Sequence, residues 1–159
     1  MTSFQEGIVA VNKVRYSGGC RCGRISYKIS GEPTWKVSCH CNWCQTSSGS
    51  AFRTFLLFEE HEISFSGNTL KSYEDTKTEH GRPMINQFCV NCGTIIGIKV
   101  PDMEQRHISI GTLDQRAEVT THDNIWGQEA LKFVSFSDES DLYKTGYWNG
   151  TGEKMKKPR

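Results

Sequence analysis

Three cysteines within six residues constrain this chain more than any other feature of its sequence. Residues 39–44 read Cys-His-Cys-Asn-Trp-Cys. In an extended segment neighbouring side chains alternate faces, so Cys39 and Cys41 share one face and His40 points the other way. A turn over the next two residues then brings Cys44 back to the same point. Three converging sulfurs form an incomplete zinc shell, because structural zinc takes four protein ligands and catalytic zinc keeps one position open.

Four further cysteines form two pairs, each on a tight turn with a glycine at its exit. Cys20 and Cys22 lie in Gly-Gly-Cys-Arg-Cys-Gly. Cys89 and Cys92 lie in Phe-Cys-Val-Asn-Cys-Gly. Together these four residues, the four-cysteine cluster, supply a closed shell that is typical of structural zinc. Single cysteines are often plain core residues, but here every cysteine is clustered and the total of seven is odd, which favours metal over disulfides.

The remaining thiols, Cys39, Cys41 and Cys44, are the three-cysteine cluster, and three interpretations of it stay open. In the first, His40 completes the shell. In the second, a distant histidine completes it: His80, His107 or His122. In the third, zinc is held by the three cysteines alone and keeps an open position. Three thiolates leave that ion with a net negative charge, so it is a weak Lewis acid toward water and suits a thiol that loses its proton on binding.

Length and charge limit the classes of protein to which the chain can belong. A chain of 159 residues is long enough for one core, and we expect a single zinc-binding domain over residues 16–148. Residues 1–15 are predicted to be an N-terminal tail and residues 149–159 a basic, solvated C-terminal tail. The formal net charge of +1 argues against bulk attraction to nucleic acid or membranes. We see no signal peptide and no long apolar run, so we expect a cytoplasmic protein with reduced thiols.

Short apolar or alternating segments predict a mostly β domain with little helix. The predicted strands are residues 25–29, 35–37, 51–58, 63–65, 70–73, 84–88, 94–100 and 107–113. Turns or polar loops are expected at residues 17–23, 45–50 and 74–83, and one helical turn at residues 129–132. A set of late aromatic residues is expected to cover the sheet: Trp126, Phe133, Phe136, Tyr143, Tyr147 and Trp148.

The order of the cysteine motifs resembles that of the glutathione-dependent formaldehyde-activating enzyme family, which includes the centromere protein V relatives. The motifs are Gly-x-Cys-x-Cys-Gly at residues 18–23, Cys-His-Cys-x-x-Cys at 39–44 and Phe-Cys-x-x-Cys-Gly at 88–93. A weaker downstream signature is Gly-Thr-Leu-Asp at residues 111–114, with His122 and Trp126 after it. The resemblance covers roughly residues 16–126.

This resemblance implies a β-tent, a fold of mostly antiparallel sheets held by zinc. It implies a structural zinc on the four-cysteine cluster and a second zinc on the three-cysteine cluster, where the thiol of glutathione binds. The implied reaction is the condensation of glutathione with formaldehyde to S-(hydroxymethyl)glutathione, which is classed as carbon–sulfur lyase chemistry.

One departure from the family pattern concerns the residues that follow Cys44. Family members often have basic residues there, and this chain has Gln45 and Thr46. Glutathione carries two carboxylates, so its site needs a cation. Arg53 is the nearest candidate, with the alternative that it is a solvated residue on an edge strand. Three residues near the cluster are candidate proton carriers or hydrogen-bond donors: His40, Ser47 and Ser48.

The sequence therefore predicts a zinc-dependent carbon–sulfur lyase that joins glutathione or a related small thiol to formaldehyde or another small aldehyde. Zinc would lower the pKa of the thiol so that it reacts at neutral pH. The alternative is a non-enzymatic, zinc-stabilised module that binds chromatin, microtubules or a protein, as the centromere protein V relatives suggest. A complete shell around the second zinc would favour that alternative. The sequence does not determine the thiol, the aldehyde or the oligomeric state.

Overall fold

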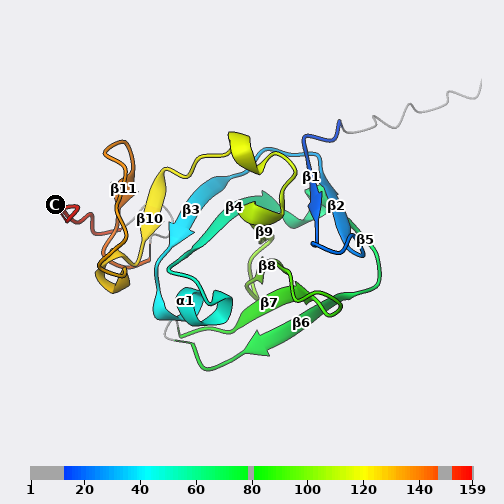
Figure 1. Ribbon diagram of the computed structural model, residues 1–159, viewed down its shortest axis with the longest axis horizontal. Coiled ribbons are helices and arrows are strands. Elements are labelled where there is room, and N and C mark those ends of the chain that lie inside the picture. The colour runs from blue at the N-terminus through cyan, green and yellow to red at the C-terminus, as the bar shows by residue number, and fades with distance from the viewer. Residues whose placement is uncertain (1–12, 79–80, 147–151, 159) are drawn as a thin grey trace, which may run out of the picture.

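The computed structural model describes residues 13–78, 81–146 and 152–158. These residues form two β-sheets with short helices between the strands (Figure 1). The strands are β1 (Tyr16–Gly19), β2 (Ser26–Ile29), β3 (Trp35–Cys39), β4 (Arg53–Glu59), β5 (Ile63–Ser66), β6 (Leu70–Asp75), β7 (Met84–Cys89), β8 (Ile95–Lys99), β9 (Gln105–Ser109), β10 (Asp123–Ile125) and β11 (Asp141–Leu142). The helices are α1 (Asn42–Ser48) and the 3₁₀ helices η1 (Glu60–Glu62), η2 (Ile110–Thr112), η3 (Arg116–Glu118) and η4 (Gly127–Glu129). The prediction of a mostly β fold with little helix is confirmed.

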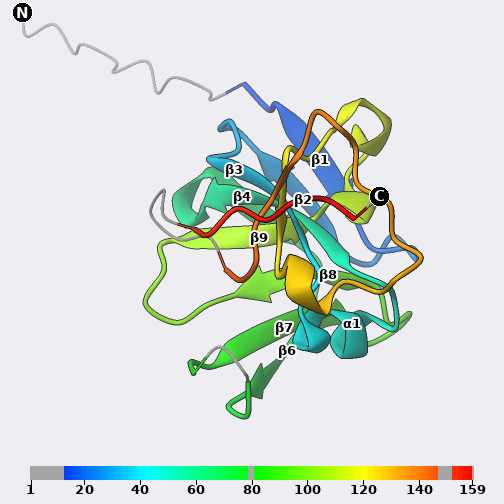
Figure 2. The same ribbon diagram turned by 90° about the vertical axis from the view of Figure 1, so that its left-hand side faces the viewer.

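The larger sheet has the strand order β11-β10-β3-β4-β9-β8-β7-β6, and Figure 2 shows the run from β3 to β6. The smaller sheet has the order β1-β2-β5 and lies at the opposite end of the molecule from β10 and β11 (Figure 1). Pairing is antiparallel in the smaller sheet and from β3 to β6. β10 is the exception, because it pairs parallel with both β3 and β11. Parallel neighbours need a long connection, and residues 126–140 provide it between β10 and β11.

β4 is buried on both faces and separates two hydrophobic cores. Its residues 55–58, Phe-Leu-Leu-Phe, include no polar side chain, and successive side chains of a strand point to opposite faces. The first and third of them belong to the core that contains the three-cysteine cluster. The second and fourth belong to the core that contains Cys20 and Cys89. The three-cysteine cluster and the two buried members of the four-cysteine cluster therefore lie in separate cores, on opposite sides of β4.

The main local correction concerns residues 42–48, which form α1 and not the predicted turn and polar loop. Cys41 is extended and caps this helix, because its Sγ accepts a hydrogen bond from the N–H of Cys44 at 3.3 Å. Gly49 ends the helix in the left-handed conformation, with φ at 64°, and donates its N–H to the carbonyl of Gln45. Such a short helix shows no apolar period in the sequence, and its stability comes from caps and packing.

The other differences from prediction lie at element ends and late in the chain. β1 includes residues 17–19, which were expected to belong to a turn. The predicted strand 107–113 ends at Ser109, where η2 follows. β10 and β11 are too short for a sequence pattern to reveal them. η4 overlaps the helical turn predicted at residues 129–132 only at Glu129, its last residue. Among the predicted covering aromatics, Tyr143 is buried and Phe133 is 77% exposed, while Tyr147 and Trp148 lie outside the described residues.

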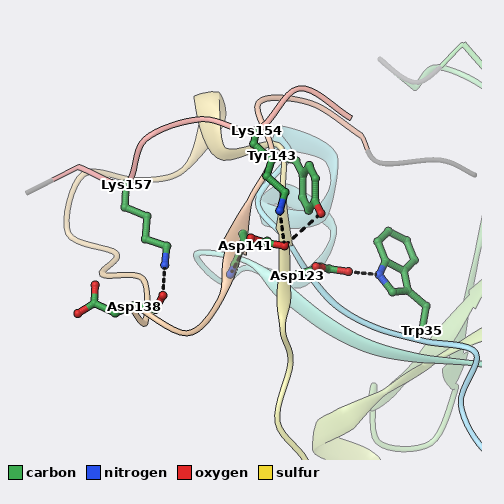
Figure 3. A network of polar contacts seen from close by, with 8 residues as sticks. Trp35, Asp123, Asp138, Asp141, Tyr143, Lys154 and Lys157 are labelled. Carbon is green, nitrogen blue, oxygen red and sulfur yellow. Dashed lines mark hydrogen bonds and ion pairs between the residues drawn. The ribbon is translucent and has the colours of Figure 1, made fainter. Parts of the chain in front are cut away.

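Residues 152–158, which belong to the predicted C-terminal tail, pack along β11 at the edge of the larger sheet (Figure 3). The N–H of Met155 donates to the carbonyl of Leu142 at 2.9 Å. The Nζ of Lys154 donates to Oδ2 of Asp141 at 2.8 Å. These contacts cover part of an edge that would otherwise expose unpaired backbone groups. In the part of the chain that the structure describes, no helix is both long and apolar enough to span a membrane.

Candidate functional site

The four-cysteine cluster connects the smaller sheet to the larger one. Cys20 and Cys22 lie between β1 and β2, whereas Cys89 and Cys92 lie at the turn between β7 and β8. Their sulfurs all lie within 4.8 Å of one another, so the group could hold a metal ion. The N–H of Ile25 donates to Sγ of Cys20 at 3.2 Å, which orients this sulfur from the backbone. A metal bound here would link two sheets that come from distant parts of the sequence.

Hydrogen bonds favour thiolates in part of this cluster. The hydroxyl of Thr94 lies 3.2 Å from Sγ of Cys92 and, with the backbone of the same residue, lowers the pKa of Cys92 to about 6. The hydroxyl of Thr69 lowers the pKa of Cys89. The thiolate is the form of cysteine that binds metal. Hydrogen bonds therefore favour the thiolate at two of the four sulfurs, whereas burial raises the pKa of Cys20.

The three-cysteine cluster is buried where β3 meets α1. Cys39 ends β3, Cys41 caps α1 and Cys44 lies in its first turn. The most exposed of them, Cys39, is only 7% exposed. The three sulfurs lie within 4.8 Å of one another and could hold a metal ion. The predicted convergence is confirmed, although a helical turn brings the third cysteine back.

The three thiols cannot all ionise side by side unless a cation joins them. The hydrogen bond with Cys41, together with burial, raises the pKa of Cys39 well above its ordinary value. Hydrogen bonds with Cys39 and Cys41, together with burial, raise the pKa of Cys44 as well. A bound metal ion reverses this balance, because thiolates that repel one another are all attracted to the ion.

No histidine belongs to this cluster within the residues that the structure describes. His40 is occupied elsewhere, because its Nε2 lies 3.1 Å from Oδ1 of Asn124 and its ring packs against two phenylalanines. His122 is exposed. His107 is buried on β9 and is not among the grouped ligand atoms. His80 lies outside the described residues, so that part of the prediction stays open.

Arg53 is a buried cation next to the three-cysteine cluster. It stands opposite Cys39 in the pairing of β3 with β4 and is only 5% exposed, so the alternative of a solvated edge residue is wrong. Its Nη1 donates to Oδ1 of Asn86 at 2.8 Å and to Oγ of Ser47 at 3.2 Å. Its guanidinium carbon lies 4.9 Å from the ring centre of Phe55. Its Nη2 is buried and has no hydrogen-bond partner.

The charge of Arg53 fits a metal–thiolate centre. Burial lowers the pKa of Arg53, and the thiols of Cys44, Cys39 and Cys41 oppose that shift. Among the described residues its hydrogen bonds go to neutral groups, and a buried charge normally needs an opposite charge nearby. Three thiolates around a divalent ion leave one negative charge, which this guanidinium balances. The donor set and its counter-charge therefore suit a divalent, thiol-binding metal.

The polar residues of α1 mainly hold the helix in place. The Oγ atoms of Ser47 and Ser48 both donate to the carbonyl of Cys44, at 3.4 Å and 2.7 Å. Gln45, where the sequence resemblance led us to expect a basic residue, donates its Nε2 to the carbonyls of His40 and Glu129, at 2.6 Å and 2.9 Å. Gln45 therefore has a structural role at this position, because its side-chain amide links α1 to η4.

A cavity of about 30 Å³ lies beside Cys39 and Cys44. Its walls are mostly apolar and come from β3, β4, β7, β8 and β10, and its polar lining residues include His107 and Arg82. Trp126 also lines it and adopts a φ of 61°, which is uncommon for any residue other than glycine. Such backbone conformations often occur at functional sites. The sequence motifs did not indicate this cavity, because its walls come from α1 and six separate strands, the five named above and β9.

A family model described as "Glutathione-dependent formaldehyde-activating enzyme" matches residues 15–129. No curated protein matches the chain. Among solved structures, the crystal structure of a protein from Rhodobacter sphaeroides is similar in fold, with 17% sequence identity and a TM-score of 0.50. The alignment covers 66% of this chain and 96% of that one. The matched segment contains both cysteine clusters, Arg53 and the cavity, so the chain belongs to the glutathione-dependent formaldehyde-activating enzyme family.

Proposed function

We propose that the chain is a zinc-dependent carbon–sulfur lyase, with a structural zinc on the four-cysteine cluster and a reactive zinc on the three-cysteine cluster. The observation that carries this proposal is the set of three buried thiols, with a buried arginine and a small cavity beside them. Zinc there supplies an open position at which a small thiol loses its proton at neutral pH. We place the reaction in the cytoplasm, where the seven thiols stay reduced.

The chemistry assigned to the site is the addition of a thiol to a small aldehyde. The sulfur forms a bond to the carbonyl carbon while the carbon–oxygen double bond becomes single. The oxygen takes up one proton, which balances the proton that the thiol released. When the aldehyde is formaldehyde, the product is a hydroxymethyl thioether. The apolar walls around Cys39 and Cys44 exclude water from this step. The charge of Arg53 favours an anionic sulfur in the site.

Glutathione is the thiol that the family suggests, and a second hollow supports its placement. Ser47 and Asn86, the two residues that accept hydrogen bonds from Arg53, line an open surface hollow of about 350 Å³. A carboxylate that entered there could replace one of these neutral acceptors and pair with the guanidinium. We therefore assign Arg53 and Ser47 to the binding of glutathione, with Ser48 beside them. His40 has a supporting role at most in this assignment, since Asn124 holds its Nε2.

We expect two metal ions per chain, and acid should release them at different pH values. Metal binding displaces thiol protons, so affinity falls as the pH falls. The pKa of Cys92 is about 6 and that of Cys89 is lowered, so protons compete weakly at two ligands of the four-cysteine cluster, although burial raises the pKa of Cys20. The pKa values of Cys39 and Cys44 are raised, so protons compete strongly there and this ion should leave first. Native mass spectrometry during an acid titration counts the ions, and alkylation shows which thiols become free. A single ion in the fully reduced protein, or loss from the four-cysteine cluster first, would contradict the assignment.

A direct test of the function replaces zinc by cobalt and adds glutathione. Sulfur entering the open position should change the visible spectrum, and calorimetry in buffers of different ionisation enthalpy should show that one proton is released. Magnetisation-transfer NMR can then measure whether the zinc protein accelerates the exchange of formaldehyde with glutathione, with cysteine as a second thiol. Cys41→Ser is the control that subtracts the uncatalysed reaction. If no thiol changes the cobalt spectrum and the wild type accelerates nothing, the non-enzymatic binding module replaces this proposal.

A further inference from the structure

His107 is a buried histidine whose polar ring has no role in stabilising the fold that would explain its position. It lies on β9, opposite Leu57 of β4 and Ile98 of β8, and is only 5% exposed. Its ring stands edge-on to Phe55 with the ring centres 5.5 Å apart. Its Nδ1 is buried and has no hydrogen-bond partner. Buried polar atoms are nearly always paired, so an unpaired ring nitrogen calls for a ligand.

The cavity that His107 lines has the size of a very small molecule. About 10–15 Å³ of such space holds one water, so the volume of about 30 Å³ has room for roughly two groups of that size. Formaldehyde has two heavy atoms, a carbon and an oxygen. The apolar walls, among them Met84 and Trp126, suit the carbon end. His107 offers a polar contact for the oxygen end, on the same cavity as Cys39 and Cys44.

The charges around His107 favour a developing negative charge on that oxygen. Burial, with further contributions from Arg53 and Arg82, lowers the pKa of His107 to about 3. The ring is therefore neutral at physiological pH and carries a hydrogen on one nitrogen, so it can donate a hydrogen bond without adding charge. The guanidiniums of Arg53 and Arg82, which add to the effect of burial on His107, also attract an oxyanion.

We propose that this cavity is the carbonyl subsite of the reaction described above, and that Nδ1–H of His107 donates a hydrogen bond to the aldehyde oxygen. The inference rests on the proposed function. As the sulfur–carbon bond forms, the electron pair of the carbonyl moves to the oxygen, and the hydrogen bond stabilises it there. His107 keeps its proton, and the oxygen is protonated by solvent as the adduct leaves the cavity, which takes back the proton that the thiol released. The subsite fits formaldehyde and excludes aldehydes with longer carbon chains by size.

Two substitutions at His107 separate hydrogen bonding from packing. His107→Phe fills the space and removes the donor, so we expect kcat/KM for formaldehyde to fall about 100-fold, the usual effect of losing one oxyanion donor. His107→Asn places an amide nitrogen near the position of Nδ1 and should recover at least about tenfold of that loss. Both variants should bind glutathione like the wild type in the cobalt spectrum. His61→Phe makes the same replacement of imidazole by phenyl at an exposed histidine on η1, and it is the control for that replacement at the protein surface.

A second readout does not depend on turnover. Formamide is an unreactive carbonyl compound of nearly the right size, and butyramide is a larger one. We expect formamide, but not butyramide, to shift the ¹⁵N resonance of His107 Nδ1 in the zinc-loaded wild type. If the wild type turns over but His107→Phe is equally active, or if formamide leaves this resonance unchanged, the inference is overturned. If formamide shifts the resonance and no thiol reacts, the proposed function fails and the carbonyl subsite stands. Should His107→Phe not fold, His107→Asn and the resonance decide the question.

Discussion

Cys89→Ser is expected to unfold the domain or to detach the smaller sheet, whereas Cys41→Ser should leave the fold intact. Cys89 is fully buried at the end of β7, and its sulfur lies 3.8 Å from that of Cys22 on the turn between β1 and β2. Structural zinc binding contributes about 10–16 kcal/mol in zinc-finger peptides. The whole stability of a domain is only about 5–15 kcal/mol. Losing one of the four thiolates can therefore remove a free energy as large as the whole stability of the domain.

Cys41→Ser differs because the serine can keep the local structure. Cys41 caps α1 by accepting the N–H of Cys44, and serine is among the best residues at an N-cap. The metal of the three-cysteine cluster binds residues of β3 and of the helix that follows it directly, so it joins neighbouring rather than distant segments. We expect the change of cap to cost below about 2 kcal/mol, or a melting shift under about 8 °C for a chain of this size, and the buried charge of Arg53 to add to this loss once the metal has left.

Thermal melts of the two variants, followed by circular dichroism in reducing buffer, give the comparison. Cys41→Ser should retain one metal ion and a cooperative transition. Cys89→Ser should lose the cooperative transition near the wild-type temperature. If Cys41→Ser is destabilised as severely as Cys89→Ser, the three-cysteine cluster is a second structural centre, and the enzyme proposal is weakened with it.

Arg53→Met is expected to have opposite consequences for the zinc-loaded and the metal-free protein. In the loaded protein the guanidinium balances the negative metal–thiolate centre, and removing one partner of a buried charge pair costs about 3–5 kcal/mol. In the metal-free protein the raised pKa values keep Cys39 and Cys44 protonated, so Arg53 is a buried cation without a charged partner. Methionine then fills a similar volume against Phe55 without that penalty, and stability should be equal or higher.

The measurements for Arg53→Met are zinc affinity at the three-cysteine cluster and melting with and without metal. Chelator competition should show an affinity loss of at least about 100-fold, because each 1.4 kcal/mol is about tenfold. Arg53→Lys is the matched control, since it keeps the charge but loses the planar fork that reaches Asn86 and Ser47. It should preserve most of the zinc affinity. Equal destabilisation of the loaded and metal-free forms by Arg53→Met would show that its contacts matter through packing and not through charge.

The sequence predicted those features that neighbouring residues control. Strand segments with alternating apolar residues, such as residues 25–29, were placed correctly because burial alternates along them with a period of two. α1 was missed because its seven residues form a helix through the Cys41 cap and the Gly49 terminus, with too few turns for a period. β10 was missed because it is a strand only by virtue of pairing with β3 and β11.

Cysteine spacing alone predicted that the three sulfurs of the three-cysteine cluster meet. The covalent chain holds Cys39, Cys41 and Cys44 close together in any compact fold, so local geometry was enough. Tertiary structure alone decided what surrounds them. Arg53 reaches the cluster because β4 pairs with β3, and His107 lines the cavity because β9 pairs with β4 on its other side. Those pairings bring together residues far apart in the sequence, and they follow from burying both faces of β4 at once, a condition that no short motif records.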